Sequence, residues 1–399
     1  MFSMWLGWSI IGVSFAGLSY PAFESVFLKK KYNERKLKEN LQRAFINAEL
    51  YKKHGDKKEY PLILRMQQKR ERLTFVFSVP KGINPDKFEK ALYIFKQHFG
   101  MFINLEVNEK RGILNVYPAG LPNKIKYNYG DIQESLKGKL PIVCGQSLEG
   151  EIYSFDLVKF PHVLISGETG SGKSSEIRSI LTTLIKSKTP KELKLVLGDL
   201  KRSEFHLFKQ IGHVEGVYHS ADTLRPELNK VKREMTKRGD KLDAAGVNSI
   251  DQLKELTPYI IVCIDEVALL KKEKDIMDIL EEISSIGRSL GVFVILSMQR
   301  PDADLLDGKL KVNLTVRMGF KTADSINSKI IGTPGAEKIT IPGRMILKVN
   351  SELQEIQCPW IDNEPARKLL KPYKVNVREN IKEPVMDEYS ELKELFSDE

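Results

Sequence analysis

The second half of the chain repeats one pattern, in which short apolar runs alternate with stretches of helical periodicity. Apolar runs of this kind are typical of strands that are buried on both faces. Their regular alternation with helices predicts an α/β fold over residues 141–350, with a mainly parallel sheet that helices cover on both sides. The strand candidates are His162–Ser166, Leu193–Asp199, Tyr259–Asp265, Val292–Ser297 and Thr315–Phe320.

A different pattern comes before this domain. Leu73–Val79 alternates between apolar and other residues as a half-buried strand does, and Asn84–Phe99 carries apolar residues on one helical face. Two more strand candidates, Met101–Val107 and Gly112–Tyr117, are joined by a turn. We therefore predict a small α+β domain over residues 59–140 with the order β-α-β-β. Because nothing in it resembles a catalytic site, we interpret it as an assembly or connector domain.

The amino terminus is apolar enough to cross a membrane. Residues 1–23 contain no charged residue, and about 20 such residues span a bilayer. Between residues 29 and 43 there are seven Lys or Arg and two Glu, an asymmetry typical of the cytoplasmic side. We predict a transmembrane anchor over 1–28 and a basic juxtamembrane helix over 29–58. The protein would then be a single-pass protein of the cell membrane with its α/β domain in the cytoplasm. A buried N-terminal helix is the alternative.

Composition narrows the class of protein. Of the 399 residues, 41% are hydrophobic and 29% charged, which excludes a disordered chain and a polytopic membrane protein. The net charge of +10 fits a polyanionic partner or an anionic membrane surface, and equally a solvated Lys-rich surface. Three widely spaced cysteines argue against a zinc site. The C-terminal segment, 351–399, ends in an acidic tail, with seven acidic residues and one Lys between 383 and 399.

The strongest candidate chemistry follows the first apolar strand of the α/β domain. The stretch GETGSGKS fits the P-loop pattern G-x-x-x-x-G-K-[ST] and lies between a strand and a helix. Its glycines allow backbone N–H groups to point at the phosphates of ATP, and the helix N-terminus adds partial positive charge. Lys173 is expected to reach the β- and γ-phosphates, and Ser174 to ligate Mg²⁺. The predicted nucleotide-binding residues are Gly167, Glu168, Thr169, Gly170, Ser171, Gly172, Lys173, Ser174 and Ser175.

Two carboxylates, Asp265 and Glu266, end the buried strand Tyr259–Asp265. We expect this strand to lie beside the P-loop strand, so that Asp265 joins Ser174 in the Mg²⁺ shell. Glu266 would then act as general base toward the attacking water. A strand-end Asp-Glu pair can also cap the next helix, but its combination with a P-loop favours ATP hydrolysis.

Two further polar residues flank the strand Val292–Ser297. Gln299 follows its end, where a glutamine can orient the attacking water, although a plain turn residue is the alternative. Arg288 precedes it on a predicted helix and could reach the nucleotide of a neighbouring subunit in a ring, or could be an ordinary surface arginine.

Residues from about His162 to Lys348 resemble the motor domain of the FtsK/SpoIIIE family of DNA translocases. The matching stretches are VLISGETGSGKS from Val163, DLK from Asp199, IDEVA from Ile264, GRSLG from Gly287, MQRP from Met298 and PGAE from Pro334. The predicted small domain is similar to the one that precedes the motor in that family. The resemblance implies a RecA-like P-loop ATPase that assembles into a homo-hexameric ring, threads DNA and uses Arg288 in trans.

The sequence departs from the chromosome-segregating members of that family. Those members have several membrane helices, a long linker and a C-terminal winged helix, whereas this sequence shows one apolar segment, no long linker and a short acidic C-terminal segment. The compact layout resembles coupling proteins of Gram-positive conjugative elements, which implies a relaxase and transfer-channel proteins as partners. Two alternatives stay open: a chromosome-segregation or sporulation DNA pump, and a protein-secretion ATPase.

DNA is expected to contact a surface away from the acidic ATP site, in the pore of a ring. Lys and Arg bind phosphates without regard to sequence, as a motor that moves along any DNA requires. Solvated surface charges are the alternative. The candidate residues are Lys237, Arg238 and Lys241 in one segment and Lys309 and Lys311 in another.

Overall fold

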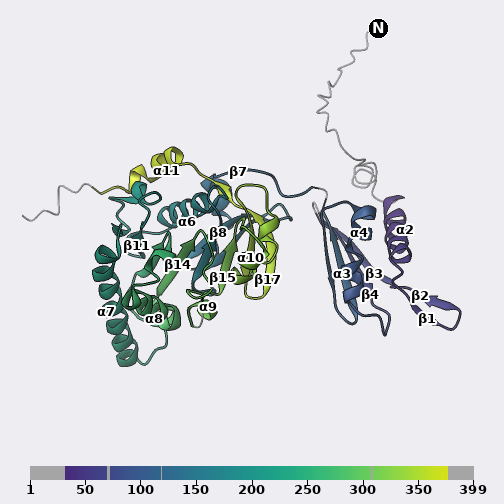
Figure 1. Ribbon diagram of the computed structural model, residues 1–399, viewed down its shortest axis with the longest axis horizontal. Helices are drawn as coiled ribbons and strands as arrows, with labels where there is room; N and C mark the ends of the chain where they lie inside the picture. The colour runs from purple at the N-terminus through teal and green to yellow at the C-terminus, as the bar shows by residue number, and fades with distance from the viewer. Residues whose placement is uncertain (1–31, 70–71, 118, 307–308, 376–399) are drawn as a thin grey trace, which may run out of the picture. The chain divides into compact units, whose positions relative to one another are not determined.

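The computed structural model describes residues 32–69, 72–117, 119–306 and 309–375. These residues form two compact units that divide between Gly120 and Leu121 (Figure 1), here called the small unit and the large unit. The predicted membrane anchor and the acidic tail lie outside the described residues. Within the described ranges, no helix is both long and apolar enough to span a bilayer. The anchor therefore stays a prediction.

The small unit is a four-stranded antiparallel sheet with helices packed against it. The strand order is β3-β4-β6-β5. In β4, alternate residues are buried, and Phe75 and Phe77 join Phe88, Phe95 and Phe45 of the helices in one core. The elements are α2 (Tyr32–Asn47), β1 (Lys52–His54), β2 (Lys57–Glu59), β3 (Ile63–Lys69), β4 (Arg72–Ser78), α3 (Asp86–Lys90), α4 (Leu92–Phe99), β5 (Ile103–Val107) and β6 (Arg111–Val116).

The small unit contains the predicted β-α-β-β order but extends it at the front. The basic helix predicted over 29–58 ends at Asn47, and the chain then turns at Gly55, whose φ is +61°, to form the β1-β2 hairpin. Leu41 and Phe45 of α2 are fully buried, and the Phe45 ring lies 5.0 Å from that of Phe77. This helix is therefore part of the core of the small unit rather than a juxtamembrane helix separate from it.

The large unit is built on a ten-stranded sheet whose first six strands in spatial order are parallel. Four antiparallel strands extend it. The order is β12 (Val214–Tyr218), β11 (Leu193–Gly198), β13 (Tyr259–Ile264), β14 (Val292–Met298), β10 (Val163–Ser166), β15 (Val316–Gly319), β16 (Arg344–Val349), β17 (Glu352–Gln357), β8 (Pro141–Gln146) and β9 (Ile152–Asp156). All five predicted strands are present, which confirms the α/β class.

Helices cover both faces of the large sheet, and the central strands are therefore buried on both faces. In β14, Phe293 packs in the core beneath α6 (Lys173–Ser187), and Val294 packs in the opposite core beneath α7 (Ala221–Ala245) and α8 (Lys274–Leu290). Figure 1 shows α7 and α8 side by side, and they pack directly against each other. This arrangement accounts for the continuous apolar runs in the sequence.

Three expectations about the large unit need correction. Strand β14 lies between β10 and β13, so the strand that carries Asp265 is not beside the P-loop strand. The unit begins at Leu121 rather than at 141, since β7 (Ile125–Lys126) pairs with β18 (Pro359–Trp360). It also continues past 350, because β17 pairs along its length with β16 and α11 (Asn363–Leu370) packs on α6.

Candidate nucleotide site

The P-loop joins β10 to α6 as the sequence predicts. Gly170 and Gly172 have φ values of +80° and +105°, a backbone conformation that favours glycine. A side chain at Gly172 would lie 2.5 Å from the backbone nitrogen of Gly343, while a side chain at Gly170 would meet nothing within 4 Å. The loop is therefore packed against the protein on one side and open on the other, as a phosphate cradle requires.

Neighbouring strands hold the first residues of the loop in place. The backbone N–H of Gly167 donates to the Met298 carbonyl, and that of Glu168 to the Lys321 carbonyl. Ser171 and Gly172 are buried, whereas Thr169 is exposed. The Ser175 hydroxyl bonds to the backbone of Ile361, so the side chain of this predicted ligand serves the fold and only its main chain can face a phosphate.

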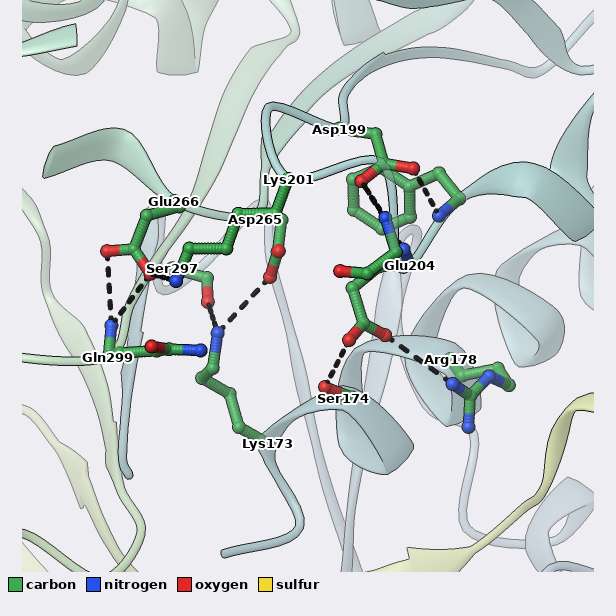
Figure 2. Close-up of polar contacts among 12 residues, drawn as sticks. Lys173, Ser174, Arg178, Asp199, Lys201, Glu204, Asp265, Glu266, Ser297 and Gln299 are labelled. Atoms are coloured by element: carbon green, nitrogen blue, oxygen red, sulfur yellow. Dashed lines mark hydrogen bonds and ion pairs between the residues drawn. The ribbon is translucent and has the colours of Figure 1, made fainter. Parts of the chain in front are cut away.

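Lys173 is buried at the centre of the site, with 5% of its surface exposed. Its Nζ donates to Asp265 Oδ1 at 3.2 Å and to Ser297 Oγ at 2.8 Å (Figure 2). Burial raises the pKa of Asp265, and the positive charge of Lys173 opposes that shift. Although β14 separates β13 from β10, the parallel strands end at one edge of the sheet, and this brings the two motifs together.

Glu266 lies beside this pair and is 5% exposed. Both of its carboxylate oxygens accept from the backbone N–H of Gln299, at 3.2 Å each, and Oε2 also accepts from Lys201 Nζ at 2.7 Å (Figure 2). Gln299 thus lies at the site, and its main chain positions Glu266. The water-orienting role of its side chain stays a prediction.

Four residues of the site were not among the predicted site residues: Lys201, Ser297, Glu204 and Arg178. Ser174 Oγ donates to Glu204 Oε1 at 2.6 Å, and the other carboxylate oxygen of Glu204 accepts from Arg178 at 3.4 Å. The only sequence signal for this segment was the family-like DLK stretch at Asp199. Their partners are distant along the chain, so no local pattern could reveal these contacts.

The residues of the site fit ATP and Mg²⁺. Mg²⁺ prefers hard oxygen ligands and takes most of them from phosphates and water in sites of this kind. Ser174 and Asp265 supply such oxygens at the loop. Elsewhere in the described part of the chain, no group of three or more His, Cys, Asp or Glu residues could hold a metal by itself. The oxygens of Ser174 and Asp265 therefore suit a magnesium ion that is bound together with a nucleotide.

Arg288 lies away from this site within the same chain. It is exposed near the end of α8 and donates from Nε to the Val158 carbonyl at 3.0 Å. Because β14 starts four residues later at its amino end, Arg288 lies at the edge of the sheet opposite the P-loop. It cannot serve its own nucleotide, and its action on a neighbouring subunit stays a prediction.

The structure rules out one of the predicted DNA contacts. Arg238 is 2% exposed, and its guanidinium donates to the carbonyls of Leu290 and Pro258 at 2.8 Å each. It is thus a structural residue. Lys237 and Lys241 of the same helix are exposed, so they stay available to a phosphate.

The second predicted basic segment is only partly described. Lys311 is half-buried in α9 (Lys309–Asn313), and the side chain of Lys309 lies outside the described residues. Strand β15 follows α9 and runs parallel to β10, so α9 lies at the edge of the sheet opposite the P-loop. Lys311 therefore stays a candidate for a contact away from the nucleotide.

Comparison with known proteins identifies the family of this site. Residues 133–257 match the FtsK/SpoIIIE family. This segment is therefore similar to an FtsK/SpoIIIE domain. DNA translocase FtsK of Borreliella burgdorferi is 34% identical over 231 residues, 52% of this chain and 28% of the relative. DNA translocase FtsK of Leptospira interrogans is 31% identical over 319 residues, 69% of this chain and 32% of the relative. The chain thus spans about a third of these relatives.

Solved structures share the fold of the FtsK/SpoIIIE domain. The pCW3 conjugation coupling protein TcpA, determined with ATPγS, matches with a TM-score of 0.58 and 22% identity over 85% of this chain and 100% of that chain. EssC ATPases 2 and 3 of Geobacillus thermodenitrificans match with a TM-score of 0.56 and 22% identity over 64% of this chain and 52% of that chain. These likenesses show the P-loop ATPase fold alone.

Proposed function

We propose that this protein is a membrane-anchored, ATP-dependent DNA translocase that assembles into a ring and delivers DNA for conjugative transfer. The observation that carries the proposal is the assembled ATP site of an FtsK/SpoIIIE domain. Lys173 meets Asp265 at 3.2 Å, and the carboxylate of Glu266 is fixed beside them by the backbone of Gln299. A buried ammonium next to two buried carboxylates serves nucleotide chemistry better than it serves stability.

Each side chain has a separate part in hydrolysis. Lys173 reaches from the start of α6 toward the phosphates and is held there by Asp265 and Ser297. Ser174 and Asp265 offer oxygens to Mg²⁺, which when bound neutralises phosphate charge. Glu266 accepts a proton from the attacking water once Lys201 leaves its Oε2 atom free.

Support for a DNA substrate comes from three directions. The curated relatives are named DNA translocases, and the net charge of +10 suits a polyanion. The coupling protein TcpA is covered along its whole length, which favours conjugation with a relaxase and transfer-channel proteins as partners. A chromosome-segregation or sporulation pump would use the same chemistry.

The deciding experiment is the ATPase rate with and without double- and single-stranded DNA. We expect DNA to raise the rate of the wild-type protein and Glu266→Gln to bind ATP without hydrolysing it. Because glutamine keeps the size of the side chain and removes only the base, this variant controls for a contaminating ATPase. A wild-type rate that neither DNA form changes would count against translocation.

A protein-secretion ATPase is the second candidate, because the cytoplasmic domain of the Type VII Secretion ATPase EccC of Thermomonospora curvata matches with a TM-score of 0.54, close to that of TcpA. Such a motor would act on polypeptide, so its ATPase would ignore DNA and respond to a secreted substrate. The DNA titration therefore separates the two candidates.

The membrane anchor is tested separately from the motor. We expect the full chain to fractionate with membranes and a chain lacking residues 1–31 to remain soluble after lysis, because the apolar run would be gone. Full-length protein in the soluble fraction would contradict the anchor and leave the ATPase proposal unaffected.

Once Arg238 is excluded, the DNA contacts that we propose are Lys237, Lys241, Lys309 and Lys311. Neutralising Lys237 and Lys241 together should lower DNA affinity, flatten its salt dependence and spare the DNA-free ATPase rate, because these side chains lie on α7, away from the P-loop. Unchanged affinity across a salt titration would exclude this helix and direct attention to Lys309 and Lys311.

A further inference from the structure

The loop after β11 is shaped by one buried carboxylate. Asp199, which is fully buried, accepts from the backbone N–H groups of Ser203 at 2.9 Å, Glu204 at 3.3 Å and Phe205 at 3.0 Å. Phe205 is also buried in the core beneath α6. Three bonds to consecutive N–H groups fix the backbone of the loop, and therefore fix where the Glu204 side chain starts (Figure 2).

The Glu204 side chain reaches the predicted magnesium ligand. Its Oε1 atom accepts from Ser174 Oγ at 2.6 Å, the distance of a charge-assisted O–H···O⁻ bond. A serine hydroxyl has one proton and two lone pairs. Because the Ser174 O–H donates its hydrogen bond to Glu204, the lone pairs of the Ser174 oxygen face away from Glu204 and are free to bind a cation.

Arg178 holds Glu204 from the other side. It lies one turn beyond Ser174 on α6, pairs with Glu204 Oε2 at 3.4 Å and donates to the Ile361 carbonyl at 2.8 Å. The Arg178 and Glu204 side chains are 11% and 15% exposed, so water screens their charges only weakly. The carboxylate is thus fixed by a cation that is itself anchored to the backbone.

We propose that Glu204 is a positioning residue for magnesium, which orients the Ser174 hydroxyl so that its lone pairs face the ion. The inference rests on the proposed binding of Mg²⁺ with nucleotide. Residues that hold a metal ligand from behind contribute roughly 10- to 100-fold to metal affinity. Without Glu204, the Ser174 hydroxyl can rotate and turn its proton toward the ion.

The test measures ADP affinity twice, once with Mg²⁺ and once with EDTA, using a fluorescent ADP and the full protein. The ratio of the two affinities reports how strongly the metal supports nucleotide binding, without requiring turnover. We expect Glu204→Ala to lower this ratio about ten-fold or more and to leave the affinity in EDTA within about two-fold. Glu204→Gln keeps an acceptor oxygen and the side-chain size, so it should fall between alanine and wild type.

Glu215→Ala is the matched control. Glu215 lies on β12, which pairs with β11, and its exposed carboxylate pairs with Lys194 at 2.7 Å, far from any phosphate ligand. This variant should keep the wild-type ratio. If Glu204→Ala does not fold, the glutamine variant still decides the question, since a wild-type ratio in a folded Glu204→Gln protein contradicts the proposal.

Two further results would overturn the inference. One is a Glu204→Ala ratio equal to that of wild type, and the other is an equal loss of affinity in EDTA, which would mean a general defect of the pocket. If wild-type protein binds ADP no more tightly with Mg²⁺ than with EDTA, the proposed function fails and this inference fails with it. A normal wild-type ratio with an unaffected variant removes only the role of Glu204.

Discussion

Replacing Arg238 should lower the stability of the large unit without a direct effect on DNA binding. The guanidinium joins α7 to two carbonyls, that of Leu290 at the end of α8 and that of Pro258 just before β13. Arg238→Ala leaves both carbonyls without this donor, that of Leu290 at a buried position and that of Pro258 at a partly buried one. The chain thereby loses a tie between one helix and two neighbouring elements.

The size of the effect follows from these contacts. A buried acceptor that loses its donor costs about 1–3 kcal/mol, so the two carbonyls together cost about 2–6 kcal/mol. The third bond, to Glu234, adds little because that carboxylate is 41% exposed. For a large domain, each kcal/mol lowers the melting temperature by about 2–4 °C, which predicts a decrease of about 4–24 °C.

The assay is thermal unfolding of the purified protein together with DNA affinity at a temperature where every variant is folded. Lys237→Ala, one residue away and exposed, should change stability by less than about 0.5 kcal/mol. Arg238→Lys keeps the charge but not the fork of donors, so it should also lose most of the stabilisation that the Arg238 hydrogen bonds provide. A variant at 238 that melts like wild type and binds DNA more weakly would refute this reasoning.

Three other predictions concern the ATP site and the core. Lys201→Met should raise the DNA-free ATPase rate several-fold, because the ammonium no longer competes with water for Glu266; an unchanged rate would mean that this pair does not restrain the base. Arg288→Ala subunits should bind ATP but hydrolyse it poorly, and mixing them with Lys173→Ala subunits should restore some activity. Mixed rings that form without any restored activity would contradict an action of Arg288 on the neighbouring subunit. Burial raises the pKa of Glu176 well above its usual value of 4.5. The protonated carboxyl group therefore makes its full contribution to stability below about pH 4.5, and this contribution decreases as the pH rises. The melting temperature of Glu176→Gln should therefore rise relative to that of the wild-type protein between about pH 5 and pH 8. A difference in melting temperature that stays constant over this range would contradict a buried neutral carboxyl group.

Much of the site is written in short stretches of the sequence. The P-loop lies between its strand and helix as predicted, and Asp265 and Glu266 follow β13. These predictions succeed because they depend on local physics: an apolar run forms a buried strand, and glycines permit the turn that follows. The prediction that the strands of Asp265 and Lys173 are neighbours was wrong. The two side chains still meet, because parallel strands end at the same edge of the sheet.

Contacts between distant parts of the chain were decided by the tertiary structure alone. The sequence shows Arg238 as one cation in a basic helix, and only the packing of α7 against α8 makes it a buried donor. Lys201 and Glu204 likewise gain their meaning from partners 65 and 30 residues away. Periodicity and motifs report how a segment folds and which face it buries. The partner of a charged side chain depends on which strands become neighbours, and that is fixed only when the whole sheet assembles.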